Sequence, residues 1–330
     1  YEMSASLVGS EMCIRDSGLI MLLTLVPCCM GYRTIHAWSK LISWVAGGVI
    51  LYCLWLGYRA FPPGTMADMH GTLAGFCSTF TAAALWQIAY APYVSDSSRY
   101  LPADAAGSHA AFLITYIGTV TGTVLPMVLG SMIAMQANGA SVATVLAHLA
   151  GIWATPVLVV LTLSIALGNA ISLYGGALSA MTVIQTFMPD WRAALRDRML
   201  ATLLLVGVAL VMALGMAGSF MQSYAAFLDL LMAVMVPWTA INLADYYLLR
   251  RGLYDVPSFF RRDGGVYGYC NIPALGAYAI GAVAELPFMQ NGFHTGTFAR
   301  MLHGVDVSWI VGLVVTSMVY ILTARHREQA

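Results

Sequence analysis

The chain has 330 residues, of which 60% are hydrophobic and only 9% are charged, and its formal net charge is zero. Soluble domains carry about 25% charged residues, so this chain has too little polar surface for a fold in water, and we expect lipid to surround it. The balanced charge excludes the strongly basic surface that is typical of nucleic-acid-binding proteins.

The N-terminal segment "YEMSASLVGSEMCIRDS" differs from everything that follows it. It is polar and aperiodic, and it lacks the basic start and apolar run of a signal peptide. We therefore expect residues 1–17 to be a non-native segment and residues 18–330 to form a membrane domain. Because the apolar run begins abruptly at Gly18, we also expect further membrane helices upstream of it.

Apolar segments follow along the whole chain, each near or above the roughly 20 residues that a helix needs to cross the hydrocarbon core. They must be helical, because an isolated strand leaves its backbone polar groups unsatisfied in lipid. Lysine and arginine lie almost entirely in alternate connections, which predicts a multi-pass protein of the cell membrane with a cytoplasmic C-terminus. The expected spans of this all-α polytopic bundle are 18–37, 41–61, 71–94, 108–135, 152–185, 198–219, 221–249, 270–289 and 307–324.

The third of these segments runs into the sequence "ALWQIAYAPYVSDSSRYLP", from Ala84 to Pro102. Pro92 removes a backbone donor and clashes with the preceding turn, so we expect the helix to break or kink there, beside protein or a watery cavity. Trp86 and Tyr90 are four residues apart and share a helical face, which suits a flat solute that stacks on aromatic rings. The alternative is an aromatic belt at the membrane interface, with a kink used for packing.

The fifth segment contains "LSIALGNAISLYGGALSAM", from Leu163 to Met181, in which small and polar residues interrupt an apolar run. Asn169 and Ser172 can hydrogen-bond across a helix contact, so tight helix packing is one interpretation. The other interpretation is that both side chains line a binding site at the membrane midplane. Two interrupted helices in one bundle favour the second, because transporter sites are built in this way.

Carboxylates inside the apolar segments are further candidates, because a charge in lipid is costly. Asp229 lies inside its segment and is a candidate for cation coupling; the alternative is a residue of a hydrated vestibule. Glu285 lies near the outer end of its segment, and we expect it at the membrane interface. Asp245 lies near the cytoplasm, and we expect a gating or structural role with Arg250 or Arg251 as its partner.

Asp96 and Arg99 lie three residues apart after the third segment, and we expect them to form a structural or gating pair rather than to be catalytic. The sequence contains no HExxH, Walker or GxSxG motif, and its glycine-rich stretches follow helices rather than strands. We therefore expect a protein that is not an enzyme and that uses no cofactor or bound metal.

Four stretches of the sequence are weak indicators of a family when taken singly, but they are specific in their combination and order. They are "GYRTIHAWSK", "WQIAYAPYVSDSSRYLP" with its D-x-[ST]-R-[YF] signature, "GNAISLYGGALSA" and "VPWTAINLADYYLLRRGLYD". Together they resemble the nucleobase–cation symporters of the purine/cytosine permease family, over the chain from about Gly18 to its C-terminus. The resemblance implies a twelve-helix, leucine-transporter-like inverted-repeat fold, in which the expected spans would be helices four to twelve and "GYRTIHAWSK" a cytoplasmic turn.

The resemblance also implies roles for individual residues. Trp86 falls where the family places the aromatic residue that stacks on the substrate, and Asn169 falls on an asparagine of the family's eighth helix. In sodium-using members two hydroxyl residues precede that asparagine, whereas this chain has Leu167 and Gly168, so the resemblance favours protons over sodium as the coupling cation. The implied substrate contacts are Leu85, Trp86, Gln87, Ile88, Ala89, Tyr90, Asn169 and Ser172, and the cation-coupling candidates are Ser164 and Asp229.

The function that the resemblance implies is secondary transport: import of a nucleobase of the cytosine or purine type together with a cation. A hydantoin or an allantoin-like ring is equally flat and is an alternative substrate. A helical membrane protein that transports nothing is the alternative from another class. The expected partners are the bilayer and a small heterocycle, without nucleic acid, and the sequence does not indicate an oligomeric state.

Overall fold

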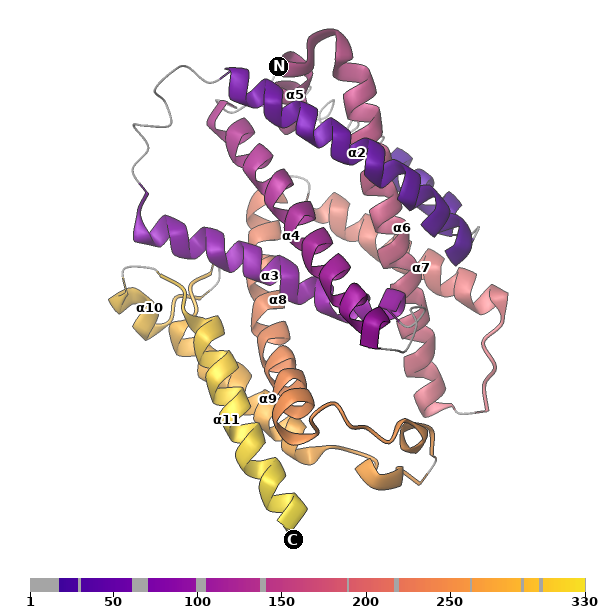
Figure 1. The fold of residues 1–330 in the computed structure, drawn as a ribbon, viewed down its shortest axis with the longest axis vertical. Helices are drawn as coiled ribbons and strands as arrows, with labels where there is room; N and C mark the ends of the chain where they lie inside the picture. The colour runs from indigo at the N-terminus through magenta and orange to yellow at the C-terminus, as the bar shows by residue number, and fades with distance from the viewer. Residues whose placement is uncertain are drawn as a thin grey trace. The chain divides into compact units, whose positions relative to one another are not determined.

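The computed structural model of the chain is built from helices throughout the residues that it describes (Figure 1). The only β-structure in that part of the chain is a single antiparallel bridge between Gln290 and Thr295. The predicted all-α class is therefore confirmed. The described ranges are 18–28, 31–60, 71–98, 105–136, 141–188, 190–216, 220–261, 263–291, 294–302 and 305–329, so the expected non-native segment 1–17 lies outside them.

The chain divides into two compact units, each made from two separate stretches of sequence. The first unit comprises Tyr1–Met69 and His109–Ser219, and the second comprises His70–Ser108 and Phe220–Ala330. In both units an early helix packs on a helix that comes much later, so each core is assembled from distant parts of the sequence.

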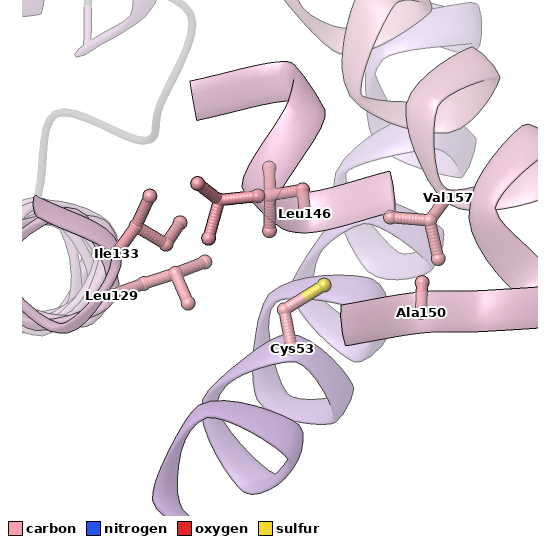
Figure 2. Close-up of a cluster of buried hydrophobic side chains, with 7 residues drawn as sticks. Cys53, Leu129, Ile133, Leu146, Ala150 and Val157 are labelled. Atoms are coloured by element: carbon pink, nitrogen blue, oxygen red, sulfur yellow. The ribbon is translucent and has the colours of Figure 1, made fainter. Parts of the chain in front are cut away.

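The first unit is centred on its longest helix, α6, against which α2, α5 and α7 pack. In the core, Leu129 and Ile133 lie four residues apart and therefore present one face of α4 to Cys53 of α2 (Figure 2). The full core cluster is Cys53, Leu129, Ile133, Val145, Leu146, Ala150 and Val157. The elements are the helix Gly18–Cys28, α2 (Tyr32–Ala60), most of α4 (Ala105–Gln136), α5 (Val142–Ala150), the 3₁₀ turn η1 (Gly151–Trp153), α6 (Ala154–Phe187) and α7 (Leu195–Met216).

The second unit is organised around α8 and α11, since α3 packs on α8 while α9 packs on both α8 and α11. One core cluster joins Leu85 of α3 to Met232 and Val236 of α8. A second joins Ala277 of α9 to Tyr320 of α11. The elements are α3 (Leu73–Ser98), α8 (Phe220–Leu243), the π-helical turn η3 (Ala244–Leu249), the 3₁₀ turns η4 (Val256–Phe260) and η5 (Gly265–Tyr267), α9 (Ile272–Glu285), the 3₁₀ turn η6 (Leu286–Phe288), α10 (Thr297–Met301) and α11 (Ser308–Gln329).

The N-terminal helices differ from the prediction. We expected a connection between spans 18–37 and 41–61, but residues 32–60 form one continuous helix. No glycine or proline occurs between Tyr32 and Val45, so nothing in this stretch stops a helix. The helix boundary lies instead before Tyr32, where Gly31 has a φ of +94°, a conformation that glycine adopts at little cost.

The short helix α5 is an element that the predicted spans omit. Its start carries a capping signal, because the Ser141 hydroxyl accepts a hydrogen bond from the Thr144 amide at 3.2 Å. Its end is marked by Gly151, which has a φ of +55°. Both signals are present in the sequence, so the helix could have been predicted from them.

Several helices have the length and composition needed to cross a membrane. In the described residues five meet both criteria: Thr34–Ala60, Gly107–Gln136, Val142–Phe187, Leu195–Gly215 and Ala226–Leu249. Shorter apolar helices cover Gly18–Cys28, Ile272–Phe288 and Ser308–Ala324. Large apolar side chains such as Trp44 and Leu204 are exposed on these helices, which suits a lipid environment and not an aqueous one.

Candidate functional site

The helix that carries the aromatic candidates is continuous. α3 runs from Leu73 to Ser98 with Pro92 inside it, so the helix does not break at Pro92, and of the expected break or kink the break is wrong. Proline deprives only one carbonyl of its helical donor, and long membrane helices tolerate this. The main-chain groups of Leu85 to Ala89 therefore lie in regular helix, where their amides and carbonyls face along the helix axis.

The two faces of α3 have different surroundings. Leu85 is only 4% exposed and packs against Met232 and Val236 of α8. Trp86, by contrast, is 55% exposed, and Tyr90, one turn further along the same face, is also exposed. α3 is thus fixed to its own unit through Leu85, while the Trp86 indole lies outside that core. The Tyr90 ring stacks on the Tyr93 ring, with 6.2 Å between the ring centroids.

The other candidates on this helix are less exposed than Trp86. Gln87, Ile88 and Ala89 are half-buried, and Ile88 packs against the cluster around Leu85. Asp96 falls within the helix, but its side chain lies outside the described part of the chain, as does the whole of Arg99. The expected pairing of these two residues therefore stays a prediction.

The second candidate helix, α6, is also continuous. It runs from Ala154 to Phe187, so the expected interruption near Asn169 is wrong. A Cβ on Gly176 would lie 3.4 Å from Leu205 of α7, so at least this glycine serves the close packing of two helices. Asn169 and Ser172 are exposed, which shows that neither is used for packing within the first unit.

The candidates on α3 and on α6 belong to different units. The structure groups Leu85 to Tyr90 on one helix of the second unit, and it groups Asn169 and Ser172 on one helix of the first. Ser164, half-buried, lies on α6 as well. That all of them contribute to one substrate site stays a prediction.

Asp245 has partners that sequence reasoning missed. One carboxylate oxygen accepts a hydrogen bond from the Tyr254 hydroxyl at 2.6 Å, and the other accepts one from the Tyr320 hydroxyl, also at 2.6 Å. The Asn271 side-chain amide in turn donates to the Tyr320 oxygen at 3.2 Å. This cluster ties the connection after η3 to the start of α9 and to α11.

A pocket of about 380 Å³ opens beside this cluster. One wall of the pocket is aromatic. The rings of Phe259 and Tyr267 stack with 4.6 Å between their centroids, and the Arg250 guanidinium carbon lies 5.5 Å from the centroid of the Tyr267 ring. Burial raises the pKa of the Tyr254 hydroxyl above its ordinary value, and the hydrogen bond to Asp245 raises it further. The lining residues are Asp245, Leu249, Arg250, Tyr254, Phe259, Val266, Tyr267, Asn271, Pro273, Tyr320 and Ala324.

The two remaining carboxylates differ in burial. Asp229 is half-buried on α8, and both of its expected roles, cation coupling and a place in a hydrated vestibule, stay predictions. Glu285 is 0% exposed and is therefore enclosed by the protein, while its expected depth at the membrane interface stays a prediction. It is buried because Gly312 of α11 has no side chain and leaves room for the carboxylate.

Long apolar helices that expose large hydrophobic side chains define the chain as a multi-pass membrane protein. Residues 6–312 match the family described as permeases for cytosine/purines, uracil, thiamine and allantoin, and the chain belongs to this family. It is also similar to a curated purine-cytosine permease, YxlA, of Bacillus subtilis (strain 168): 31% of 322 aligned residues are identical, over 97% of this chain and 69% of the relative. No solved structure matches the chain.

The family assignment confirms the resemblance that the four sequence stretches indicated, and with it the class of transporter. The residues most characteristic of that resemblance are now placed. Trp86 lies on the exposed face of α3, and Asp245 lies at the centre of a hydrogen-bonded cluster.

Proposed function

We propose that the protein imports a nucleobase of the cytosine or purine type together with a cation, with its C-terminus in the cytoplasm. The family and the relative support transport of this class of molecule. The observation that carries the proposal is the family match together with Trp86, which falls where the resemblance places the stacking aromatic residue and is 55% exposed although the same helix buries Leu85. An unpacked indole on an otherwise anchored helix suits a planar ligand.

In this proposal the indole of Trp86 stacks on the ring of the base, with Tyr90 beside it on the same face. Stacking recognises a flat ring but does not distinguish one base from another, so polar groups must read its edge. Gln87 and Asn169 are the candidates for that role, with Ser172 a weaker one. Leu85 and Ile88 position the indole by fixing α3 to its unit, and Leu85, Ile88 and Ala89 stay candidates for main-chain contact with the base.

We infer that the coupling cation is a proton. Sodium needs several oxygen ligands, and the positions where the resemblance places two hydroxyls hold Leu167, which is buried, and Gly168. Ser164 is the oxygen-bearing residue one turn earlier on α6. Asp229, half-buried on α8, is a candidate carrier of the proton.

Uptake by the protein expressed from its complete gene tests the proposal. Trp86→Ala should raise the KM for cytosine or adenine about tenfold to a hundredfold, because stacking of a base on an aromatic ring contributes ~1–3 kcal/mol. Trp44→Ala is the matched control, since Trp44 is an exposed tryptophan of α2. Saturable uptake with an unchanged KM in Trp86→Ala would reject the stacking role.

The family description names allantoin beside the nucleobases, so an allantoin-like ring is the second candidate substrate. Competition separates the two candidates. If unlabelled allantoin displaces labelled cytosine and is itself accumulated more efficiently, the substrate class is the hydantoin or allantoin-like ring and not the nucleobase.

A further inference from the structure

α9 and α11 lie side by side (Figure 1). The contacts at two glycines show that they approach each other closely at two successive levels. At one level the Glu285 side chain of α9 fills the space that a Cβ on Gly312 of α11 would occupy. At the next level the Thr316 side chain of α11 fills the space that a Cβ on Gly281 of α9 would occupy. These four residues, which we call the α9–α11 seam, form two reciprocal pairs in which a glycine admits a polar side chain.

The polar atoms of the seam have no partners. Glu285 and Thr316 are both 0% exposed, and in the described part of the chain neither carboxylate oxygen nor the threonine hydroxyl makes a hydrogen bond. A buried acceptor without a donor is rare, and each such group costs free energy. A purely structural contact would be served as well by apolar residues.

In the described part of the chain, no cationic side chain forms a hydrogen bond or ion pair with Glu285. Asp306, in the segment before α11, accepts hydrogen bonds from the backbone N–H groups of Gln290 and Ser308 and from the Ser308 hydroxyl. The Tyr278 hydroxyl of α9 donates to the Val234 carbonyl of α8. Further titratable groups on the packed elements include Asp229 of α8, Tyr320 of α11, Arg300 of α10 and His294, whose ring nitrogen lies 3.0 Å from the Leu286 carbonyl. The C-terminal end of α11 also carries Arg325, His326, Arg327 and Glu328.

We propose that Glu285 is a proton-binding residue whose charge depends on the packing of α9 against α11. While the seam is closed the side chain is a neutral carboxylic acid, because an ionised carboxylate without a partner would be too costly there. When the helices separate, water reaches the acid and accepts its proton, and the electron pair stays on the carboxylate. This rests on the proposed cation symport and names a residue that couples it.

Accessibility distinguishes Glu285 from Asp229, the other carboxylate candidate. Asp229 is accessible in the structure, so its ionisation does not require a rearrangement. Ionisation of Glu285 does require a rearrangement, because the carboxylate is enclosed as long as Gly312 lies against it. A transporter couples a proton to substrate when protonation and conformation depend on each other, and Glu285 satisfies that requirement.

Proteoliposomes containing the protein from its complete gene test the proposal with two separate measurements. Exchange of labelled cytosine against internal cytosine needs no cation gradient, whereas accumulation under an inward proton gradient needs coupling. Glu285→Gln imitates the neutral acid, so it should keep exchange within about twofold of wild type and lose proton-driven accumulation. Glu328→Gln, near the C-terminal end of α11, is the matched control and should behave as wild type.

The pH dependence of substrate binding gives an independent result from the same samples. In wild type the affinity for cytosine should fall as pH rises and the acid ionises, and in Glu285→Gln it should be independent of pH.

The proposal would be overturned if Glu285→Gln showed the same proton-driven accumulation and the same pH dependence as wild type. Accumulation in wild type driven by sodium alone would also overturn it. Absence of cytosine and purine exchange in wild type would instead overturn the proposed function. If Glu285→Gln does not reach the membrane, proton uptake on adding cytosine to wild type decides, because its absence excludes a proton-binding residue.

Discussion

Two carboxylates of the second unit lie against the same helix, α11, and have opposite surroundings. Asp245 meets it at Tyr320, and both of its oxygens accept tyrosine hydroxyls at 2.6 Å. Glu285 meets it at Gly312, and neither of its oxygens has a hydrogen-bond partner in the described residues. A carboxylate with full partners gains stability from its charge, whereas a buried one without partners destabilises the protein unless it binds something.

This difference assigns a structural role to the Asp245 cluster and a role in conformational change to the α9–α11 seam. The Asp245 cluster joins three elements at one end of the helices, and every hydrogen bond in it would have to break before they could separate. The α9–α11 seam holds its helices together by close contact alone, and its polar atoms gain rather than lose by letting water in. We therefore expect the helices to move at the seam and to stay fixed at Asp245.

The largest expected effect on stability is that of Asp245→Ala. Two hydrogen bonds to a charged group are lost and two tyrosine hydroxyls are left without an acceptor, so the free energy of unfolding should fall by about 3 kcal/mol. Unfolding in mixed micelles with rising SDS content measures it. Asp229→Ala, on α8 and half-buried, is the control and should lose less than about 1 kcal/mol. A similar loss in both variants would remove the contrast between the clusters.

A smaller effect is expected at the seam, from Gly312→Ala. The new Cβ collides with the Glu285 carboxylate, and overpacking of this kind costs about 1–3 kcal/mol. Gly276→Ala, on the neighbouring α9 with open space around its Cβ, should leave stability unchanged or raise it slightly. The same unfolding measurement applies. If Gly312→Ala is as stable as Gly276→Ala, then the two helices do not meet as described.

The smallest expected effect concerns the pH dependence of stability at Tyr254. Its pKa is raised in the folded protein by burial and then by the bond to Asp245, so the folded state holds the proton more tightly than the unfolded one. This contribution is present below the ordinary tyrosine pKa of about 10 and is lost as pH rises above it. Unfolding midpoints at neutral and strongly alkaline pH should therefore diverge less in Tyr254→Phe than in wild type. Tyr269→Phe, an exposed tyrosine of the same connection, should keep the wild-type difference.

The sequence predicted the helical class and the family because both depend on local or ordered patterns. Apolar runs without charge demand helices in lipid, and the stretches around Trp86, Asn169 and Asp245 identified the permease family before any contact was known. The continuity of α3 through Pro92 was missed because proline's effect on a helix depends on what surrounds the freed carbonyl.

The partners of the carboxylates were not predictable from the local sequence. Tyr320 lies 75 residues after Asp245, and the sequence pointed instead to the adjacent arginines. The burial of Glu285 depends on Gly312, an ordinary-looking glycine in another helix, and on the spacing that brings the two together. The relation between α3 and α6, on which a shared substrate site depends, is a property of packing and is absent from local patterns.

The most direct test of the account measures stability and coupling together in Asp245→Asn and Glu285→Gln. We predict that Asp245→Asn lowers the unfolding midpoint while the folded protein still accumulates cytosine in response to a proton gradient. Glu285→Gln should keep or raise the midpoint and lose that accumulation. The opposite pattern, with coupling lost at Asp245 and kept at Glu285, would contradict the assignment of one carboxylate to structure and the other to transport.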